Sequence, residues 1–251
     1  MTEPLLETRS LGKSFGALAA ARDINFRLEP GARHALIGPN GAGKTTFINL
    51  LTGVFLPTQG QVLLKGRDIT TMEQSGRVKL GIARTFQINR LFRGLTVLEN
   101  VYIAVAERLG VAWSMARPVG LRRDVVDEAL RLLDMLKLSR DAGHRISELP
   151  YGRQRLVELA IALGLEPEVL LLDEPAAGVP SAESHIILDA VAALPKHIGV
   201  LIIDHDMDLV FRFAQRITVL VGGAIFAEGT PKEIASDQRV RDVYLGQAHH
   251  G

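Results

Sequence analysis

A short glycine-rich segment between a strand pattern and a helix pattern constrains this chain more than any other feature. Residues 34–37, HALI, form an apolar run that is typical of a buried strand. The next eight residues, GPNGAGKT from Gly38 to Thr45, fill the template G-x-x-x-x-G-K-[ST]. Apolar side chains then recur at helical spacing from Phe47 to Val54, and Gly53 marks the expected end of that helix. A strand, a loop and a helix in this order predict a phosphate-binding loop.

The residue types in this phosphate loop (Gly38–Thr45) suit a nucleoside triphosphate. Glycines let backbone N–H groups converge on phosphate oxygens without a Cβ in the way, and the helix N-terminus adds partial positive charge. We expect Lys44 to reach the β- and γ-phosphates and the Thr45 hydroxyl to ligate Mg²⁺. A glycine-rich turn that matches the template by chance is the alternative, and the flanking strand and helix disfavour it.

A second apolar run, VLLL at residues 169–172, ends at Asp173 and Glu174. A continuous apolar run is typical of a parallel strand that is covered on both faces. We expect Asp173 to hold Mg²⁺ through water, and Glu174 to orient or deprotonate the attacking water. Two acids after a strand would by themselves more often cap a helix. The phosphate loop in the same chain favours the catalytic interpretation.

A third apolar run, VLII at residues 200–203, is followed by Asp204-His205-Asp206. The carboxyl ends of the strands form the ligand-binding edge of an open α/β sheet, so we expect His205 to contact the γ-phosphate. A lone histidine is otherwise more often a surface or capping residue. Gln87, in ARTFQ, would by itself be a solvated loop residue.

Together, these segments resemble the ATP-binding subunits of ABC transporters from end to end. The matching segments are GPNGAGKTT (Gly38–Thr46), Gln87, LPYGRQR, LLLDEP (Leu170–Pro175) and His205. The resemblance implies an α/β fold: a P-loop NTPase core with a mostly parallel sheet, an antiparallel β region and an inserted α-helical lobe. It also implies ATP and Mg²⁺ as cofactors, and two such subunits that sandwich two ATP molecules.

The resemblance further implies a role for each matching residue. Lys44, Glu174 and His205 are expected to be catalytic, and Thr45, Gln87 and Asp173 to lie on Mg²⁺. The expected ATP contacts are Phe15, Gly38, Pro39, Asn40, Gly41, Ala42, Gly43, Lys44, Thr45, Thr46, Gln87, Tyr151 and Gly152. Phe15 would stack on adenine, because an aromatic face suits a flat base. A core position between N-terminal strands is the alternative for Phe15.

The signature segment, LPYGRQRL from Leu149 to Leu156, departs from the pattern of the family. Pro150 stands where a serine is usual, Tyr151 replaces the first of two central glycines, and Arg153 replaces a glutamine. Proline offers neither a hydroxyl nor an N–H, although it is favoured in the first turn of a helix. One lost hydrogen bond to a charged group costs roughly 1.5–3 kcal/mol. If that loss fell entirely on the transition state, the rate would drop about ten- to a hundredfold.

We therefore predict a weakened but working ATPase. Pro180 is a second departure, because the family usually has an aspartate there, and it affects communication across the dimer more than hydrolysis. The alternative is a subunit that closes on ATP without useful hydrolysis while a different partner subunit performs the chemistry.

Patterns in the rest of the chain predict its organisation. The core is expected at residues 1–87 and 166–251, around a helical signature lobe at 88–165. Residues 5–28 predict antiparallel strands that end in a turn at residues 29–31, and Gly222-Gly223 predicts a hairpin. Residues 110–121 predict a long loop, with Trp113 as a packing anchor. Three helices are expected from a Thr96–Glu99 capping box with Leu98, Val101, Tyr102 and Val105, from Leu130, Leu133 and Leu136, and from Leu156, Leu159, Ala160 and Leu163.

Within the family, the chain resembles the ATPases of high-affinity branched-chain amino acid importers. The segments that carry this likeness are Ile82–Ala104, the long loop, LPYGRQR, LLLDEPAAG and Val243–Gln247. Importers of amides, urea and other hydrophobic amino acids share them. The likeness implies a peripheral protein on the cytoplasmic face of the inner membrane. It also implies integral membrane permease subunits, a second ATP-binding subunit (the same or different) and, indirectly, a periplasmic binding protein as partners. Residues 88–99 would dock on the permease, with Leu91 and Phe92 exposed.

Composition excludes several other classes of protein. A net charge of +1 gives no electrostatic argument for a nucleic-acid partner, and the absence of cysteine excludes disulfides and thiolate metal sites. The N-terminus carries Glu3 and Glu7 and lacks the long apolar stretch of a signal peptide, and the apolar runs are too short to span a bilayer. A soluble ABC ATPase that acts on ribosomes or DNA would usually carry tandem cassettes or a coiled-coil insertion. A P-loop kinase or GTPase would not need the signature helix.

Overall fold

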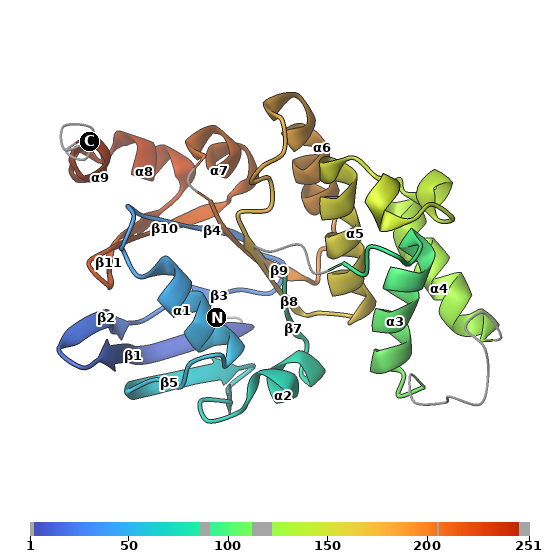
Figure 1. The fold of residues 1–251 in the computed structure, drawn as a ribbon. Helices are drawn as coiled ribbons and strands as arrows, with labels where there is room; N and C mark the ends of the chain where they lie inside the picture. Colours follow the sequence, from blue (N-terminus) through green and yellow to red (C-terminus); the bar gives the residue numbers. More distant parts are fainter. Residues whose placement is uncertain (1–2, 86–90, 112–121, 205, 246–251) are drawn as a thin grey trace. The chain divides into compact units, whose positions relative to one another are not determined.

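The computed structural model describes residues 3–85, 91–111, 122–204 and 206–245 (Figure 1). The chain divides into two compact units, which are described separately. The sheet unit comprises residues 1–82, 168–174 and 195–251, and the helical unit comprises residues 83–167 and 175–194. Residues 175–194, which the sequence analysis placed in the core, group with the helical unit because α6 packs on α5. None of the helices in the described residues is long and apolar enough to cross a membrane.

The main sheet is mostly parallel, as predicted. Its strands follow the order β11-β10-β4-β9-β8-β7. Their bounds are β4 (Arg33–Ile37), β7 (Ile82–Arg84), β8 (Val169–Asp173), β9 (Gly199–Ile203), β10 (Arg216–Val221) and β11 (Ala224–Gly229). The neighbours β10, β4, β9 and β8 pair in parallel, whereas β11 pairs antiparallel with β10. Every residue of β4, β8 and β9 is buried, which explains their continuous apolar runs.

A second, antiparallel sheet forms from the N-terminal segment, also as predicted. It contains β1 (Leu6–Phe15), β2 (Leu18–Ile24), β3 (Arg27–Leu28), β5 (Gln59–Leu64) and β6 (Arg67–Asp68). The expected turn follows β3, where the Ala32 N–H donates to the Glu29 carbonyl at 3.1 Å and Gly31 has a φ of 71°. Gly222 and Gly223, with φ of 56° and 82°, form the predicted two-residue hairpin turn between β10 and β11.

Helix α1 (Lys44–Thr52) buries one face in the core of the sheet unit. Phe47, Ile48 and Leu50 are fully buried, and the Phe47 ring meets the Phe26 ring edge-to-face at 5.5 Å. The helix ends at Gly53, as predicted, in a left-handed conformation with φ of 77°. The other helices of this unit are α2 (Gln74–Lys79), α7 (Met207–Phe213), α8 (Pro231–Ser236) and α9 (Gln238–Leu245).

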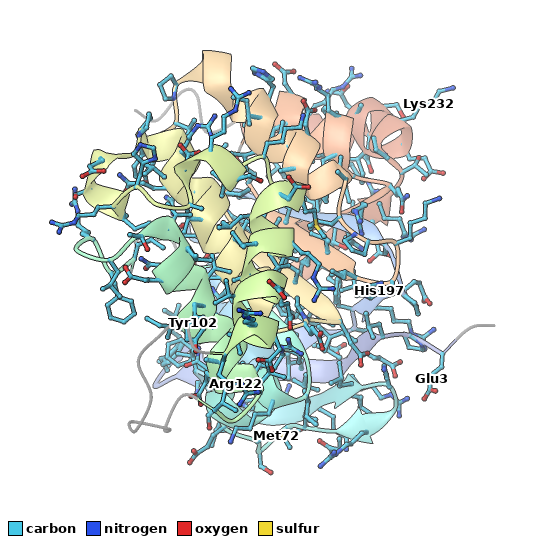
Figure 2. The ribbon with its side chains drawn as sticks, turned by 90° about the vertical axis from the view of Figure 1, so that its right-hand side faces the viewer. Glu3, Met72, Tyr102, Arg122, His197 and Lys232 are labelled. Carbon is cyan, nitrogen blue, oxygen red and sulfur yellow. The ribbon has the colours of Figure 1, made fainter. Side chains whose placement is uncertain are left out.

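The helical unit contains α3 (Val97–Arg108), α4 (Arg123–Met135), α5 (Tyr151–Gly164), α6 (Ser181–Ala192) and the 3₁₀ turns η1 (Ser139–Asp141) and η2 (Ile146–Glu148). Tyr102 of α3 and Arg122, which precedes α4, are labelled in Figure 2. The capping box at the start of α3 is confirmed. The Glu99 N–H donates to Thr96 Oγ1 at 3.1 Å, and the Thr96 N–H donates to Glu99 Oε2 at 2.7 Å.

The predicted apolar faces hold in α5 and only partly in α3 and α4. All four predicted residues of α5 are buried, whereas in α3 Leu98 and Tyr102 are only half-buried. Leu130 was predicted to lie on the buried face of α4 and is 39% exposed. The buried face of α4 instead follows Val125, Ala129 and Leu133, four residues apart, so Leu130 points away from it.

Candidate nucleotide site

Three neighbouring parallel strands, β4, β9 and β8, bring the start of the phosphate loop and Asp173 to one edge of the main sheet. The register pairs Leu36 of β4 with Ile203 of β9, and Ile203 with Asp173 of β8. Gly38 therefore begins the phosphate loop two residues beyond the level at which Asp173 ends β8. The carboxyl ends of adjacent parallel strands form the usual ligand edge of an open α/β sheet.

The phosphate loop has three backbone positions with the positive φ that glycine adopts most readily. Gly38, Gly41 and Gly43 have φ of 155°, 78° and 98°. A Cβ on Gly38 would lie 2.3 Å from the Leu220 carbonyl oxygen, and one on Gly43 would lie 2.5 Å from the Ala20 carbonyl oxygen. Side chains are therefore excluded where the loop backbone passes closest to the rest of the sheet unit. The Ala42 N–H of the loop donates to the Pro39 carbonyl oxygen at 3.1 Å.

Lys44 is the first residue of α1 and folds back over the phosphate loop. Its Nζ donates hydrogen bonds to the Gly38 and Pro39 carbonyl oxygens at 2.6 and 3.0 Å. Burial lowers the pKa of Lys44, while the carboxylates of Glu174 and Asp173 act in the opposite direction and raise it. The lysine and the two acids therefore lie within electrostatic reach of one another, as their predicted roles require.

The side chains that were predicted to face phosphate or metal from the loop are accessible. Asn40 and Thr45 are exposed, and Thr46 is half-buried. No hydrogen bond joins the Thr45 hydroxyl to another of the described residues, so its oxygen is open to a cation. Ala42 is buried, and its carbonyl oxygen accepts a hydrogen bond from the Gly223 N–H at 3.0 Å.

Asp173 and Glu174 differ in burial and in backbone conformation. Asp173 is the buried last residue of β8. Glu174 is half-buried with φ of 46°, a left-handed conformation that is uncommon outside glycine and costs energy. Its N–H donates to the Ile203 carbonyl oxygen at 2.8 Å, and this bond holds the conformation. The chain therefore turns immediately after the strand, at the residue predicted to act on water.

Phe15 ends β1 and is 43% exposed, so the alternative of a core position is wrong. Its ring packs edge-to-face on Phe55 at 5.3 Å, and Lys13 Nζ lies 5.2 Å from its centroid. An exposed ring supported by a second aromatic ring suits stacking on a base. Gln87 and His205 lie outside the described residues, and their roles stay predictions. Asp204, next to His205, is buried.

In the helical unit, Pro150 is the N-cap residue of α5, one position before the first turn in which proline was expected. Its carbonyl oxygen accepts the N–H groups of Arg153 and Gln154 at 3.0 and 3.1 Å. The N–H groups of Tyr151 and Gly152 have no acceptor among the described residues, as is usual for the first donors of a helix. The anion-attracting start of α5 therefore survives the loss of the serine.

Sequence reasoning missed a buried arginine, Arg155, within the signature segment. The Arg155 guanidinium lies 5.0 Å from the Tyr151 ring centroid and pairs with Glu158 at 2.8 Å. Arg155 Nη2 also donates to the Ala177 carbonyl oxygen at 3.5 Å, and burial raises the pKa of Glu158. These contacts connect α5 to the loop before α6, where Pro180 is the N-cap residue. Arginine in an exposed helix and arginine in a buried one look alike in sequence.

A second buried arginine, Arg77 of α2, was also missed. Its guanidinium donates to the carbonyl oxygens of Leu50, Leu51, Thr70 and Met72 at 2.6–3.0 Å. Met72 is labelled in Figure 2. Burial lowers the pKa of Arg77 to about 10, so the side chain remains charged at neutral pH. The C-terminal carbonyl groups of α1 are thus satisfied by a cation from α2.

The predicted docking surface is only partly exposed. Residues 88–90 lie outside the described residues. Leu91 is 8% exposed, so the prediction that it lies on the surface is wrong, whereas Phe92 is 59% exposed as expected. The backbone of Phe92 is held by Asn100, whose Oδ1 accepts the Phe92 N–H at 2.9 Å. The position of Phe92 is therefore fixed by the start of α3.

Comparisons with known proteins agree with this geometry. The family model described as ABC transporter matches residues 21–177, and a model described as branched-chain amino acid ATP-binding cassette transporter matches residues 224–250. The high-affinity branched-chain amino acid transport ATP-binding protein LivG of Escherichia coli is 38% identical, over 99% of this chain and 100% of its own length. The protein of the same description, BraF, from Pseudomonas aeruginosa is 36% identical, over 99% and 100%. An ATP-binding cassette of an ABC transporter, crystallised in its ADP conformation, superposes with a TM-score of 0.86 at 32% identity, covering 98% of this chain and 100% of that one.

Proposed function

The chain belongs to the ATP-binding cassette family of ABC transporters, and from this premise we propose that it powers an importer of branched-chain or related hydrophobic amino acids. It is an ATPase of that family. The observation that carries the catalytic part is the edge where Lys44 lies within reach of Asp173 and Glu174. The solute assignment rests on the names of the relatives and on the C-terminal match.

The proposed chemistry assigns one task to each group. The phosphate loop and Lys44 hold the β- and γ-phosphates. Glu174 takes a proton from water as the water oxygen bonds to the γ-phosphorus, and the bond from that phosphorus to the β–γ bridging oxygen breaks. The products are ADP and inorganic phosphate. His205 and Gln87 would contact the γ-phosphate and the metal, and Phe15 the adenine.

Thr45 and Asp173 are the proposed protein contacts of Mg²⁺. Within the described residues there is no group of three or more histidine or acidic side chains that could hold a metal. This fits Mg²⁺, which is usually bound through one or two protein groups together with nucleotide phosphates and water. Bound there, the ion would neutralise charge on the phosphates. The accessible Thr45 hydroxyl and the Asp173 carboxylate at the end of β8 are oxygen donors of the right kind.

ATPase subunits of this family dimerise and work with membrane permeases. We place the Tyr151 and Gly152 N–H groups against the γ-phosphate held by the partner subunit, where they act with the positive end of α5. Its proposed partners are a second ATP-binding subunit, integral membrane permease subunits and, indirectly, a periplasmic binding protein. A peripheral position on the cytoplasmic face of the membrane follows from this role.

Phe92 is the residue proposed to touch the permease. Its exposure at the start of the helical unit supports this, since large exposed apolar side chains favour an interface. Phe92→Asp is expected to reduce co-purification with the permease. Ile103→Asp, at a side chain 38% exposed on α3, is the matched control and should leave co-purification unchanged. Equal recovery of permease with both variants would contradict the assignment.

The catalytic proposal is tested with three variants of the purified chain. Glu174→Gln should bind a fluorescent ATP analogue like the parent but lose roughly 10²–10⁴-fold in turnover, because the base is lost. Lys44→Ala should lose both nucleotide binding and turnover. Glu29→Gln, at an exposed acid of the same unit, should change neither. Undiminished turnover by Glu174→Gln would refute the role of Glu174.

The solute is tested in proteoliposomes that contain the assembled importer. ATP-dependent uptake of leucine, isoleucine and valine is expected, with no uptake driven by Lys44→Ala. Uptake of urea or a short amide in their place would show that the chain serves a related importer, and its ATPase role would be unaffected. A mixed dimer in which only the partner's catalytic acid matters would instead make this chain the non-hydrolytic subunit.

A further inference from the structure

The helical unit contains a cavity of about 520 Å³ beside the start of α5. Its lining comes from the end of α4, the start of α5, and α6 with its C-cap residue. The lining residues are Met135, Leu136, Lys137, Pro150, Gly152, Arg153, Leu156, His185, Ile186, Ile187, Asp189, Ala190 and Ala193. Its volume lies in the range of roughly 300–1,000 Å³ that is usual for small-molecule sites. Met135, Leu136, Leu156 and Ile186 give it apolar walls, which do not suit a triphosphate.

Polar side chains, among them a lysine and an aspartate, lie among these apolar walls. Lys137, His185 and Asp189 line the cavity and are exposed, and none has a side-chain hydrogen bond or ion pair with another described residue. Arg153, which also lines the cavity, already pairs with Asp141. His185 and Asp189 are four residues apart on α6, so they lie on the same face of that helix. The cavity thus offers an ammonium group, an imidazole and a carboxylate to a ligand.

We propose that this cavity binds a hydrophobic α-amino acid. The carboxylate would meet Lys137 and His185, the ammonium group would meet Asp189, and the aliphatic side chain would enter between Leu156 and Ile186. Charge-assisted hydrogen bonds at one end and apolar contact at the other are the general pattern of such sites. The choice of amino acid rests on the proposed function, because the transported solute would be released on the side of the membrane where this chain works.

Such a ligand would contact the part of the helical unit that is proposed to act on ATP. Pro150 and Gly152, at the start of α5, line the cavity. A molecule held there would bias the position of the α5 N-terminus and so lower ATP turnover when the solute has accumulated. A ligand can shift an equilibrium only by its differential affinity for the two states. The predicted outcome is feedback inhibition by the imported amino acid.

The test is calorimetric titration of the purified, nucleotide-free chain with L-leucine. Saturable binding at one site is expected, with Lys137→Ala and Asp189→Asn each weakening it about tenfold or more, as for loss of one charged hydrogen bond. Ala190→Phe should fill the cavity and abolish binding. Arg131→Ala, at an exposed base of α4 that does not line the cavity, is the charge-matched control and should bind as the parent does.

Two analogues of leucine test whether the cavity recognises both its carboxylate and its ammonium group. Leucinamide lacks the carboxylate and 4-methylpentanoate lacks the ammonium group, so both should bind about tenfold or more weakly than leucine. Tighter binding of 4-methylpentanoate would overturn the role of Asp189. Absence of saturable leucine binding at millimolar concentration, or binding that survives Ala190→Phe and competes with MgATP, would overturn the proposal.

A further outcome concerns a different occupant. If Ile186→Asp altered the monomer–dimer equilibrium and left leucine binding intact, the cavity would be a subunit contact and the proposal would fail. The binding assay uses the isolated chain and needs no transport. A missing leucine site would therefore leave the ATPase and importer roles standing, whereas proteoliposomes that import another solute would refute the solute assignment separately.

Discussion

Replacing Arg77 by methionine is expected to destabilise the sheet unit by about 1–5 kcal/mol. Arg77 is fully buried and donates to four carbonyl oxygens. Two of these oxygens, those of Leu50 and Leu51, belong to the last turn of α1, the helix that begins at Lys44. Methionine fills much of the same volume but provides neither a donor nor a charge.

The size of this loss of stability depends on whether each carbonyl oxygen finds another hydrogen-bond donor. Leu51 is fully buried, and its carbonyl oxygen has no other donor among the described residues. Losing the hydrogen bond from Arg77 to this oxygen therefore costs about 1–3 kcal/mol. The Leu50 oxygen keeps the Gly53 N–H at 3.4 Å. Thr70 and Met72 are half-buried, so water can replace the lost donor. Removing a cation from the C-terminus of α1 adds about 0.3–2 kcal/mol.

Urea titrations followed by circular dichroism measure this loss, and hydrogen exchange of residues 48–52 locates it. Lys79→Met, at an exposed residue of the same helix, is the control and should change stability by less than about 0.5 kcal/mol. Arg77→Lys keeps the charge but not the planar fork of donors, so a smaller loss than for methionine is expected. A loss below about 1 kcal/mol for Arg77→Met would refute the claim that these carbonyl groups depend on Arg77.

Three other predictions follow from the sheet unit and the signature segment. Burial lowers the pKa of His34 to about 4, so the native state stays neutral while the unfolded state binds a proton below about pH 6.5. Stability is then lost as pH falls from 6.5 towards 4, by at most about 3 kcal/mol, and His34→Gln should flatten that slope in urea titrations at several pH values. Gly43→Ala should lower affinity for a fluorescent ATP analogue by more than about tenfold, because the new Cβ would lie 2.5 Å from the Ala20 carbonyl oxygen. A Cβ on Gly41 meets nothing within 4 Å, so Gly41→Ala should lower the affinity less. Pro150→Ser should raise the turnover of the assembled dimer by about tenfold or more by restoring a hydroxyl donor, and an unchanged rate in a steady-state assay would count against that role.

The elements that the sequence predicted well have short-range causes. The phosphate loop needs particular residues at eight successive positions, and the capping box needs a threonine and a glutamate three residues apart. The continuous apolar runs before Gly38, Asp173 and Asp204 predicted buried parallel strands, because such strands have no polar face. Each of these signals lies within about ten residues of chain, so no knowledge of distant segments was required.

The errors arose where a side chain depends on a distant segment. Spacing alone placed Leu130 with Leu133, yet the segments that cover α4 select the Val125 and Ala129 side instead. Leu91 carries no periodic signal, and its burial follows from the fold of the helical unit. Arg77 and Arg155 have the pattern of surface residues, and only packing brings the carbonyl oxygens of distant residues, such as Leu50 for Arg77 and Ala177 for Arg155, to their guanidinium groups.

By itself, the sequence determined that this chain binds a nucleoside triphosphate, because the convergence of backbone N–H groups in the phosphate loop depends only on neighbouring residues. Tertiary structure alone decided that Lys44 faces Asp173 and Glu174, which lie more than a hundred positions further along the chain. It also decided that α4, α5 and α6 leave a cavity beside the signature segment. A residue pattern encodes the face that a helix or strand buries, whereas the identity of what covers that face is set only when the whole chain packs.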